Sequence, residues 1–410
     1  MREVATMEPV IEPGTTPGQR IKLYRKRAGI TQEVAAQLKG CTVSAWRKWE
    51  SGERSVNSIG DWIDIARILK VRDLYRLTGL PVGQLPDEPG EHESVAPIRA
   101  ALLAYAPSLD GAEPDLGALS RSIAWGWDTW YGSGERYTRT GPLLAELIHT
   151  TRATLATVDG EHRRDALRLA AEVYLLVRAY GKRLGAFDIS ILGADRALAA
   201  AHDADDPLYR ASAAWHMANV LSATGHTEES AALCRDAIAD LKDVPGVAEA
   251  GRHALLGALH LMLAVQDARL RRDGAAADSL DVAERTAGVT GETTTHHLFF
   301  GPTNVGVHRS AVALEVSRAT EALRIAERVD IEQTPSLERR HTHFLHLARA
   351  YAIRREDLAA GHMLLRADQE IPEESRLNVM MRAVLRELLV RETPTTRPVV
   401  RPLAERLGIG

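Results

Sequence analysis

Cysteine is almost absent from this 410-residue sequence, which contains only Cys41 and Cys234. The two residues lie far apart and fall in different predicted domains, so their spacing defines no disulfide framework. Such sparse cysteine usage is typical of a protein in a reducing compartment, and we therefore expect a cytoplasmic location.

Long hydrophobic runs are also missing. No segment reaches the ~18 continuous apolar residues that a membrane span requires, so we expect no membrane partner. Residues 1–16 are acidic and contain proline but no apolar run, which is not the pattern of a secretory signal. We expect these residues to form a disordered N-terminal arm.

Motifs for catalysis are missing as well. The sequence contains no glycine-rich phosphate loop, no Gly-x-Ser-x-Gly elbow and no His-Glu-x-x-His motif. His341, His343 and His346 lie close together, but only the last two share a helical face, and no nearby cysteine completes a tetrahedral metal set. The sequence therefore predicts no enzyme, no metal site and no cofactor.

Positive charge is concentrated in one short region of a chain whose net charge is −4. Residues 17–80 contain 13 Lys and Arg against 6 Asp and Glu, whereas residues 81–410 contain 37 against 46. A positive field on a small domain is expected where a phosphate backbone is bound.

The same region, residues 17–80, has the pattern of two short helices joined by a tight turn. Thr31 is a good N-cap for the first helix, which ends at Gly40. Thr42 caps the second helix, and Gly52 ends it. Helices joined by so few residues cross steeply and leave the start of the second one exposed, as in a helix-turn-helix.

Several short motifs accompany this pattern: Gly18-x-Arg-Ile, Leu23-x-Arg25, Ala28-Gly-Ile-Thr-Gln32, Trp49-Glu50-x-Gly52, Ile65-Ala66-x-Ile-Leu and Val71-x-Asp-Leu-Tyr. Together they resemble the Xre/Cro helix-turn-helix family, in which the second helix enters the major groove with its first residues against base edges. The resemblance implies a DNA-facing surface made of Thr42, Val43, Ser44, Arg47 and Lys48. It also implies phosphate contacts by Gln32 and Arg54, and a largely buried pair of Arg25 with Glu50.

The side chains at these positions suit contacts with bases. Val43 can touch a thymine methyl group, Ser44 can serve either base type, and Lys48 can donate to guanine. Two positions depart from the family pattern, with Ala35 where Leu is usual and Trp46 where Ile or Val is usual. We expect the smaller and the larger residue to compensate in a shared core.

The rest of the chain is predicted to be all-α. Residues 81–95 are rich in Pro, Gly and acidic residues and read as a linker. Residues 96–392 show helical patterns with no credible strand, interrupted by turns at about 40–50-residue intervals rather than the ~34 of a regular tetratricopeptide repeat. Helical hairpins of this kind stack into a superhelix. Residues 393–410 form a tail with a short helix at 403–407.

Motifs in this second region are Leu192-Gly-Ala-Asp-Arg-Ala-Leu-Ala-Ala-Ala201 with Asp206-Pro207, Phe300-Gly-Pro-Thr-Asn-Val-Gly-Val-His308, Ala348-Arg-Ala-Tyr351 and Leu403-Ala-Glu-Arg-Leu-Gly408. They are similar to the tetratricopeptide-like domain that follows Xre-type domains in actinobacterial transcriptional regulators. The resemblance implies that the array acts as a sensor or a dimerisation surface.

Two clusters are candidates for an effector site. Trp127 and Trp130, joined by Trp215, can either form a ligand wall or pack in the core, and we favour the core. Gly301-Pro302 interrupts a helical pattern, which frees backbone groups from their helical hydrogen bonds. Thr303 and Asn304 either bind a ligand there or form hydrogen bonds with these backbone groups, and we favour the second alternative. His297, just before this interruption, is a further candidate ligand contact.

The sequence thus predicts an all-α, two-domain transcriptional regulator. We expect a homodimer that binds double-stranded DNA at a two-fold site, with half-sites about one helical turn apart. A small molecule or peptide bound to the array would change the spacing of the two DNA-binding domains. The alternative is a protein-interaction scaffold in which DNA binding is secondary.

Overall fold

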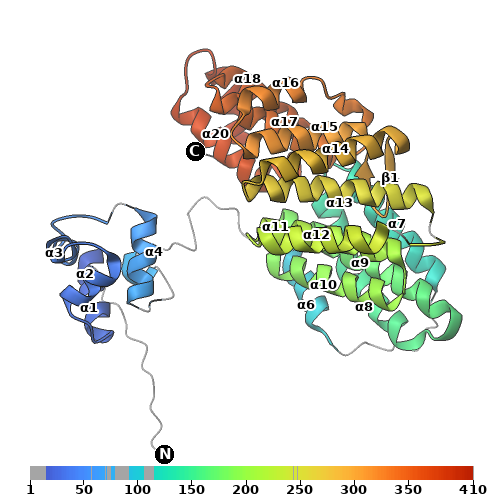
Figure 1. Cartoon of the computed structure of the whole chain (residues 1–410), viewed down its shortest axis with the longest axis horizontal. Coiled ribbons are helices and arrows are strands. Elements are labelled where there is room, and N and C mark those ends of the chain that lie inside the picture. Colours follow the sequence, from blue (N-terminus) through green and yellow to red (C-terminus); the bar gives the residue numbers. More distant parts are fainter. Residues whose placement is uncertain are drawn as a thin grey trace, which may run out of the picture. The chain divides into compact units, whose positions relative to one another are not determined.

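The computed structural model describes residues 15–56, 58–69, 71, 75–78, 92–105, 115–242, 244–246 and 248–409. These residues form two compact units, 1–88 and 89–410 (Figure 1). The predicted arm lies outside the described residues except for Thr15 and Thr16, and so does most of the predicted linker.

The first unit is a small helical domain built around the predicted helix-turn-helix. Its helices are α1 (Pro17–Arg27), α2 (Gln32–Lys39), α3 (Val43–Ser51), α4 (Ile59–Ile68) and α5 (Tyr75–Thr78). Both predicted caps are confirmed: the hydroxyls of Thr31 and Thr42 accept from backbone N–H groups at 3.3 and 3.2 Å. Gly40 and Gly52 end α2 and α3 with φ values of 72° and 82°, a conformation that favours glycine.

The core of the first unit is formed mainly by aromatic and aliphatic side chains from its helices. Trp46 is 0% exposed and Trp49 is 7% exposed, and their rings meet edge to face at 5.9 Å. Ala35 is fully buried in the same cluster as Trp46, so the small and the large residue share one core as expected. Cys41 is half-buried at the margin of this cluster.

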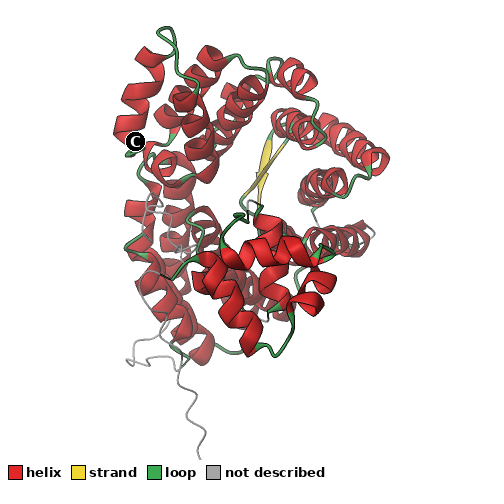
Figure 2. Cartoon of the chain, turned by 90° about the vertical axis from the view of Figure 1, so that its left-hand side faces the viewer, coloured by secondary structure: helices red, strands yellow, loops and turns green. Residues whose placement is uncertain are grey.

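The second unit is a curved array of helical hairpins (Figures 1 and 2). Its first helices are α6 (Val95–Leu103), α7 (Leu116–Gly132), α8 (Arg136–Thr157), η1 (Gly160–His162), α9 (Arg163–Arg183), α10 (Phe187–Asp203), α11 (Pro207–Ala223), α12 (Thr227–Lys242), α13 (Glu249–Arg269) and α14 (Asp273–Thr290). They are followed by α15 (Pro302–Glu315), α16 (Ala319–Ala326), η2 (Ile331–Gln333), α17 (Leu337–Ile353), α18 (Asp357–Glu370), α19 (Pro372–Leu377), α20 (Val379–Val390) and α21 (Arg397–Leu407). None of the helices in the described ranges combines the length and the hydrophobicity that crossing a bilayer demands.

The turns between paired helices share one backbone geometry. A single residue with positive φ ends the first helix of a pair, and these residues are Gly185, Asp205, Gly225, Arg271, Ser317 and Arg355. The prediction that turns separate successive helical hairpins is therefore confirmed. Serine hydroxyls reinforce three hairpins by donating to a carbonyl of the paired helix: Ser190 to Arg178, Ser230 to Ala218 and Ser310 to Ala322, at 2.9, 2.7 and 3.0 Å.

The prediction that residues 96–392 contain no strand is wrong. β1 (Thr293–Thr295) and β2 (Leu298–Phe300) pair antiparallel, and the turn between them consists of His296 and His297 with φ values of 45° and 62°. Threonines and aromatic residues favour strands, but a two-residue turn with positive φ normally carries Asn or Gly rather than two histidines. In Figure 2 the hairpin lies inside the curve of the helices.

Residues after this hairpin correct two further expectations. Gly301-Pro302 does not break a helix, because Pro302 is the first residue of α15 after a strand. The C-terminal helix α21 is longer than predicted, and its Val400, Leu403 and Leu407 are buried in the same core cluster as residues of α17, α18 and α20.

Candidate nucleic-acid interface and effector pocket

Helix α3 has one buried face and one exposed face. Trp46, Trp49 and Glu50 are buried. The side chains predicted to face DNA lie elsewhere on the helix and at its start: Thr42, Ser44, Arg47 and Lys48 are exposed and Val43 is half-buried. The helix is therefore anchored from behind, while its first turns and one polar side face solvent.

A buried carboxylate holds this helix in place. Glu50 accepts hydrogen bonds from Arg25 Nε at 2.5 Å and Nη2 at 3.1 Å, and from Trp46 Nε1 and Gln32 Nε2 at 2.7 Å each. Burial opposes ionisation of Glu50, but the hydrogen bonds from Arg25, Gln32 and Trp46 hold its pKa below the ordinary value. The implied Arg25–Glu50 pair is thus present, and it joins α1, α2 and α3.

Gln32, a predicted phosphate contact, has a structural role in this network. Its Oε1 accepts from Arg47 Nε at 3.2 Å, and Arg47 Nη2 lies 3.5 Å from Glu33 Oε1. An amide nitrogen carries two N–H donors, and within the described residues Gln32 uses only the one that Glu50 accepts. The second N–H remains available to an external acceptor such as a phosphate.

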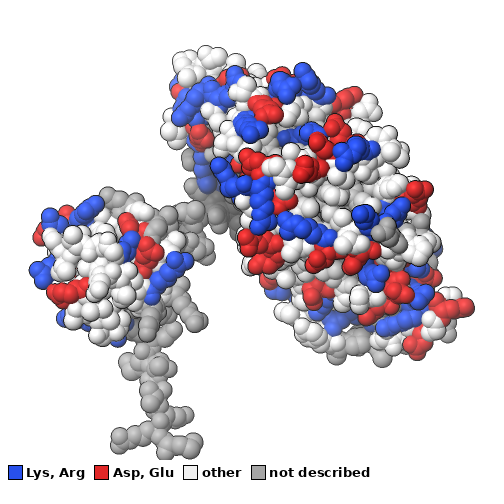
Figure 3. All heavy atoms as spheres, viewed as in Figure 1, with Lys and Arg blue, Asp and Glu red and all other residues white. Residues whose placement is uncertain are grey.

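Lys48 and Arg54 are exposed and have no ion-pair partner among the described residues. The backbone N–H of Arg54 donates to the carbonyl of Lys48 at 3.1 Å, so the loop after α3 folds back along the end of the helix. Figure 3 shows Lys and Arg interspersed with Asp and Glu on the visible faces of both units.

Residues 18–76 match the family model of a helix-turn-helix domain. The first unit contains a helix-turn-helix DNA-binding domain. The match covers the helix-turn-helix α2–α3 together with α1 and α4, and it does not extend to the second unit. No curated protein sequence matches the chain.

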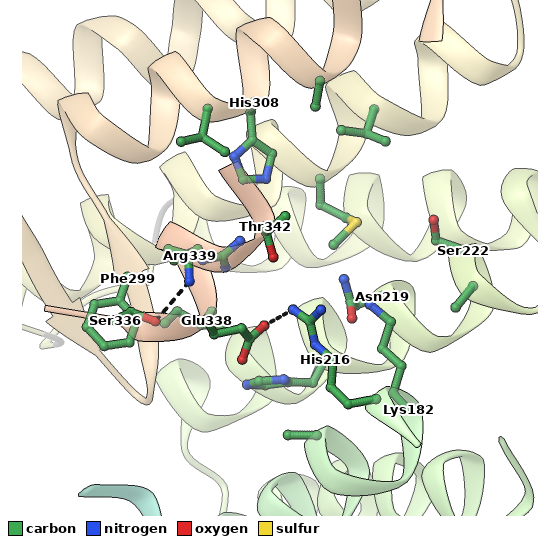
Figure 4. A pocket seen from close by; sticks show the side chains of 18 of the residues that line it. Lys182, His216, Asn219, Ser222, Phe299, His308, Ser336, Glu338, Arg339 and Thr342 are labelled. Atoms are coloured by element: carbon green, nitrogen blue, oxygen red, sulfur yellow. Dashed lines mark hydrogen bonds and ion pairs between the residues drawn. The ribbon is translucent and has the colours of Figure 1, made fainter. Parts of the chain in front are cut away.

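The second unit contains a pocket of about 440 Å³, lined by residues of α7, α9, α11, α13, the hairpin, α15, α17 and the start of α20. Of the predicted effector residues, Trp130, Trp215 and His297 line this pocket. Figure 4 shows labelled side chains of α9 and α11 facing those of the hairpin, α15 and α17.

The other predicted effector residues lie outside this lining. The ring of Trp127 stacks on that of His297 with centroids 4.0 Å apart. The backbone N–H of Thr303 donates to Glu292 at 2.7 Å. Asn304 is buried, and its Nδ2 donates to the Phe299 carbonyl at 2.7 Å, while Oδ1 has no partner among the described residues. The start of α15 is thus largely satisfied by local hydrogen bonds.

The hairpin tip is fastened to the first half of the array. The Tyr131 hydroxyl donates a hydrogen bond to the backbone carbonyl of His297. The ring Nε2 of His297 lies 3.4 Å from the carboxylate of Glu172. The Tyr209 hydroxyl donates to the same carboxylate at 2.5 Å. Burial would raise the pKa of Glu172, but the hydrogen bonds from His297 and Tyr209 hold it below the ordinary value. Helices α7, α9 and α11 therefore hold the hairpin as one wall of the pocket.

The charged pocket lining was missed by the sequence reasoning. It consists of Arg178, Lys182, Arg183, Arg269 and Arg339 together with Glu315 and Glu338. These residues come from helices that are distant in sequence, so no motif unites them. The one local signal is that Arg178 and Lys182 are four residues apart and share a face of α9.

Two histidines of α17, His341 and His343, lie in the interior of the array. His341 and His343 are buried, which lowers their pKa values to about 3 and about 4, and keeps both rings neutral. Within the described ranges, no group of three or more His, Cys, Asp or Glu residues is placed to hold a metal ion.

Proposed function

We propose that the chain is a sequence-specific transcriptional regulator that inserts α3 into the major groove of DNA. The observation that carries the proposal is the two-faced helix: Trp46, Trp49 and Glu50 fix it in the core, and Ser44 and Lys48 face solvent. The match to a helix-turn-helix domain and the excess of basic residues in 17–80 support the same function.

In the proposed complex, specificity comes from the start and the exposed side of α3. Lys48 donates to guanine, Ser44 bonds a base edge, and Val43 touches a thymine methyl group. Thr42 and Arg47 complete this surface. Gln32, through its second amide N–H, and Arg54 bond phosphates on either side of the groove.

The finer assignment rests on the motif resemblances. They place the first unit in the Xre family and make the second unit a tetratricopeptide-like array of an actinobacterial regulator. In this proposal the array mediates homodimerisation and senses a small molecule or peptide in the cytoplasm. An effector that binds one arrangement of the dimer more tightly shifts DNA occupancy by that difference in affinity.

Selection of binding sites from a random duplex library by the full-length chain tests the proposal. We expect enrichment of a two-fold symmetric sequence with half-sites about 10 base pairs apart, and affinity that falls steeply with salt. A variant with Arg324→Gln, an exposed residue of α16, should select the same sequence. Failure to enrich any sequence while the chain captures protein partners would favour the scaffold instead.

A further inference from the structure

We propose that the pocket of the second unit binds a small organic anion with an apolar body and a carboxylate or phosphate group. The proposal specifies the effector class of the proposed regulator, and only its regulatory consequence rests on that function. Binding of the anion itself depends on the pocket alone.

The first argument is the charge balance of the pocket. Arg183 and Arg136 share the carboxylates of Glu338 and Glu374 in a neutral group of four, in which the Arg183–Glu374 and Arg136–Glu338 distances are 3.1 and 3.5 Å. Two further lining residues, Arg269 and Glu315, form an ion pair at 3.1 Å. Both acidic residues that line the pocket, Glu315 and Glu338, are thus already engaged in ion pairs.

Three cationic side chains remain without a carboxylate partner. Arg178 is 5% exposed; its Nη1 donates to Asn219 Oδ1 at 3.2 Å, and its Nε has no partner. The side chains of Lys182 and Arg339 form no hydrogen bond or ion pair within the described part of the chain. The dashed line at Arg339 in Figure 4 is the bond from its backbone N–H to the Ser336 hydroxyl. An anion in the pocket would supply the missing counter-charge.

The local field agrees with this geometry. Burial and the neighbouring Arg183 and Arg178 lower the pKa of Lys182 well below its ordinary value, although Glu338 opposes the shift. Burial also lowers the pKa of Arg178 to about 10. Cations that face one another in a partly desolvated site destabilise the charged state, and a bound anion reverses that effect.

Other residues of the pocket define the rest of the ligand. His216 is 2% exposed, and neither ring nitrogen has a hydrogen-bond partner among the described residues, which is a costly state that a ligand can relieve. Trp215, Met262 and Phe299 contribute aromatic and apolar surface to the same lining. The volume of about 440 Å³ suits a single small molecule.

Two fluorescent dyes of similar shape test the role of charge. The anionic 1-anilinonaphthalene-8-sulfonate and the uncharged N-phenyl-1-naphthylamine are titrated separately into the full-length chain. We expect saturable binding of the anion at one site per chain, and much weaker binding of the uncharged dye. Equal binding of both dyes would overturn the proposal.

The variants Lys182→Met and Arg339→Gln locate the site. Each should weaken binding of the sulfonate by about 10- to 100-fold, because a charge-assisted hydrogen bond is lost, without changing binding of the uncharged dye. Arg324→Gln, which removes an exposed arginine of α16 outside the pocket, is the matched control and should leave both affinities unchanged. Unchanged sulfonate affinity in both pocket variants would place the anion elsewhere and overturn the proposal.

Thermal unfolding shows whether the variants fold. Because the side chains of Lys182 and Arg339 form no hydrogen bond or ion pair among the described residues, and burial lowers the pKa of both, their replacement should leave the melting temperature unchanged or raise it. A fall in melting temperature would show that the two cations stabilise the empty pocket, contrary to the proposal.

Calorimetry in buffers of different ionisation enthalpy gives an independent measurement. The wild-type chain should take up protons on binding the sulfonate, since the anion raises the lowered pKa of Lys182 against the field of Arg178, Arg183 and Arg339. Lys182→Met should abolish this uptake, and uptake that persists in the variant would contradict the assignment.

Displacement of the dye separates the two anion classes. Phenylacetate and phenyl phosphate carry one aromatic ring each, and we expect at least one of them to displace the sulfonate from the wild-type chain. If neither does, the proposal fails. If phenylacetate or phenyl phosphate binds but does not change the affinity of the chain for its selected DNA duplex, the pocket is still an anion-binding site. The effector role in the proposed function is then refuted.

Discussion

Replacement of Glu50 by alanine should unfold the first unit while the second unit stays folded. Glu50 is 5% exposed and accepts four hydrogen bonds, two of them from Arg25. Its removal leaves the guanidinium of Arg25, a residue that is 8% exposed, without a counter-charge. Breaking one side of a buried ion pair costs about 3–5 kcal/mol.

A second cost arises at Trp46. Its indole N–H donates to Glu50 at 2.7 Å, and a buried donor left without a partner costs about 1–3 kcal/mol. A domain of this length has a free energy of unfolding of roughly 3–10 kcal/mol, so the two losses together are comparable with the whole stability of the unit.

Hydrogen exchange followed by mass spectrometry measures the effect for each unit within the full-length chain. In Glu50→Ala, peptides from residues 17–52 should exchange as in an unfolded chain, and peptides from α9 and α13 should match the wild type. Glu53→Ala, which removes an exposed glutamate of the next loop, should change stability by less than about 0.5 kcal/mol. Wild-type exchange of residues 17–52 in Glu50→Ala would refute the role assigned to this network.

Three further predictions concern the DNA surface and the hairpin. Arg54→Ala should weaken binding to all DNA sequences alike, because a phosphate contact carries no sequence information. It should also reduce the slope of log affinity against log salt concentration by about 1; a loss of affinity confined to one base position would contradict this. Gly257→Ala should destabilise the second unit by about 1–3 kcal/mol in thermal unfolding, since its new methyl group meets the ring of Phe300, whereas Gly274→Ala, which meets nothing, should not. Glu172→Gln should lower the melting temperature of the second unit at pH 7, and because the folded pKa of Glu172 lies below 4.5, the difference from wild type should persist above that pH and narrow as the pH falls below it. A difference that grows on acidification would contradict the assigned shift.

The first unit could be predicted because its signals are local. N-caps such as Thr31 and Thr42 and the glycines that end α2 and α3 act within one helical turn, so the sequence order alone contains them. Burial of Trp46 and Trp49 followed from their spacing on one face. The link from Gln32 to Glu50 was not predictable, because it joins residues on two helices whose crossing sets their distance.

The helical array of the second unit was predicted, but the hairpin and the pocket inside it were not. The hairpin was missed because His296 and His297 occupy turn positions where Asn or Gly is the usual signal, although the flanking residues favour strands. The pocket was missed because Arg178 and Arg339 lie on helices whose proximity depends on the curvature of the whole array. No periodicity within a single helix encodes that curvature.

The central claim is that the exposed side of α3 reads bases, and the specificity of Lys48→Ala tests it most directly. Binding of this variant is measured against every single-base change of the duplex selected by the wild-type chain. We predict that discrimination falls by about 1–3 kcal/mol at one base position and is retained at the others. An unchanged preference at every position would contradict the assignment of α3 as the reading helix.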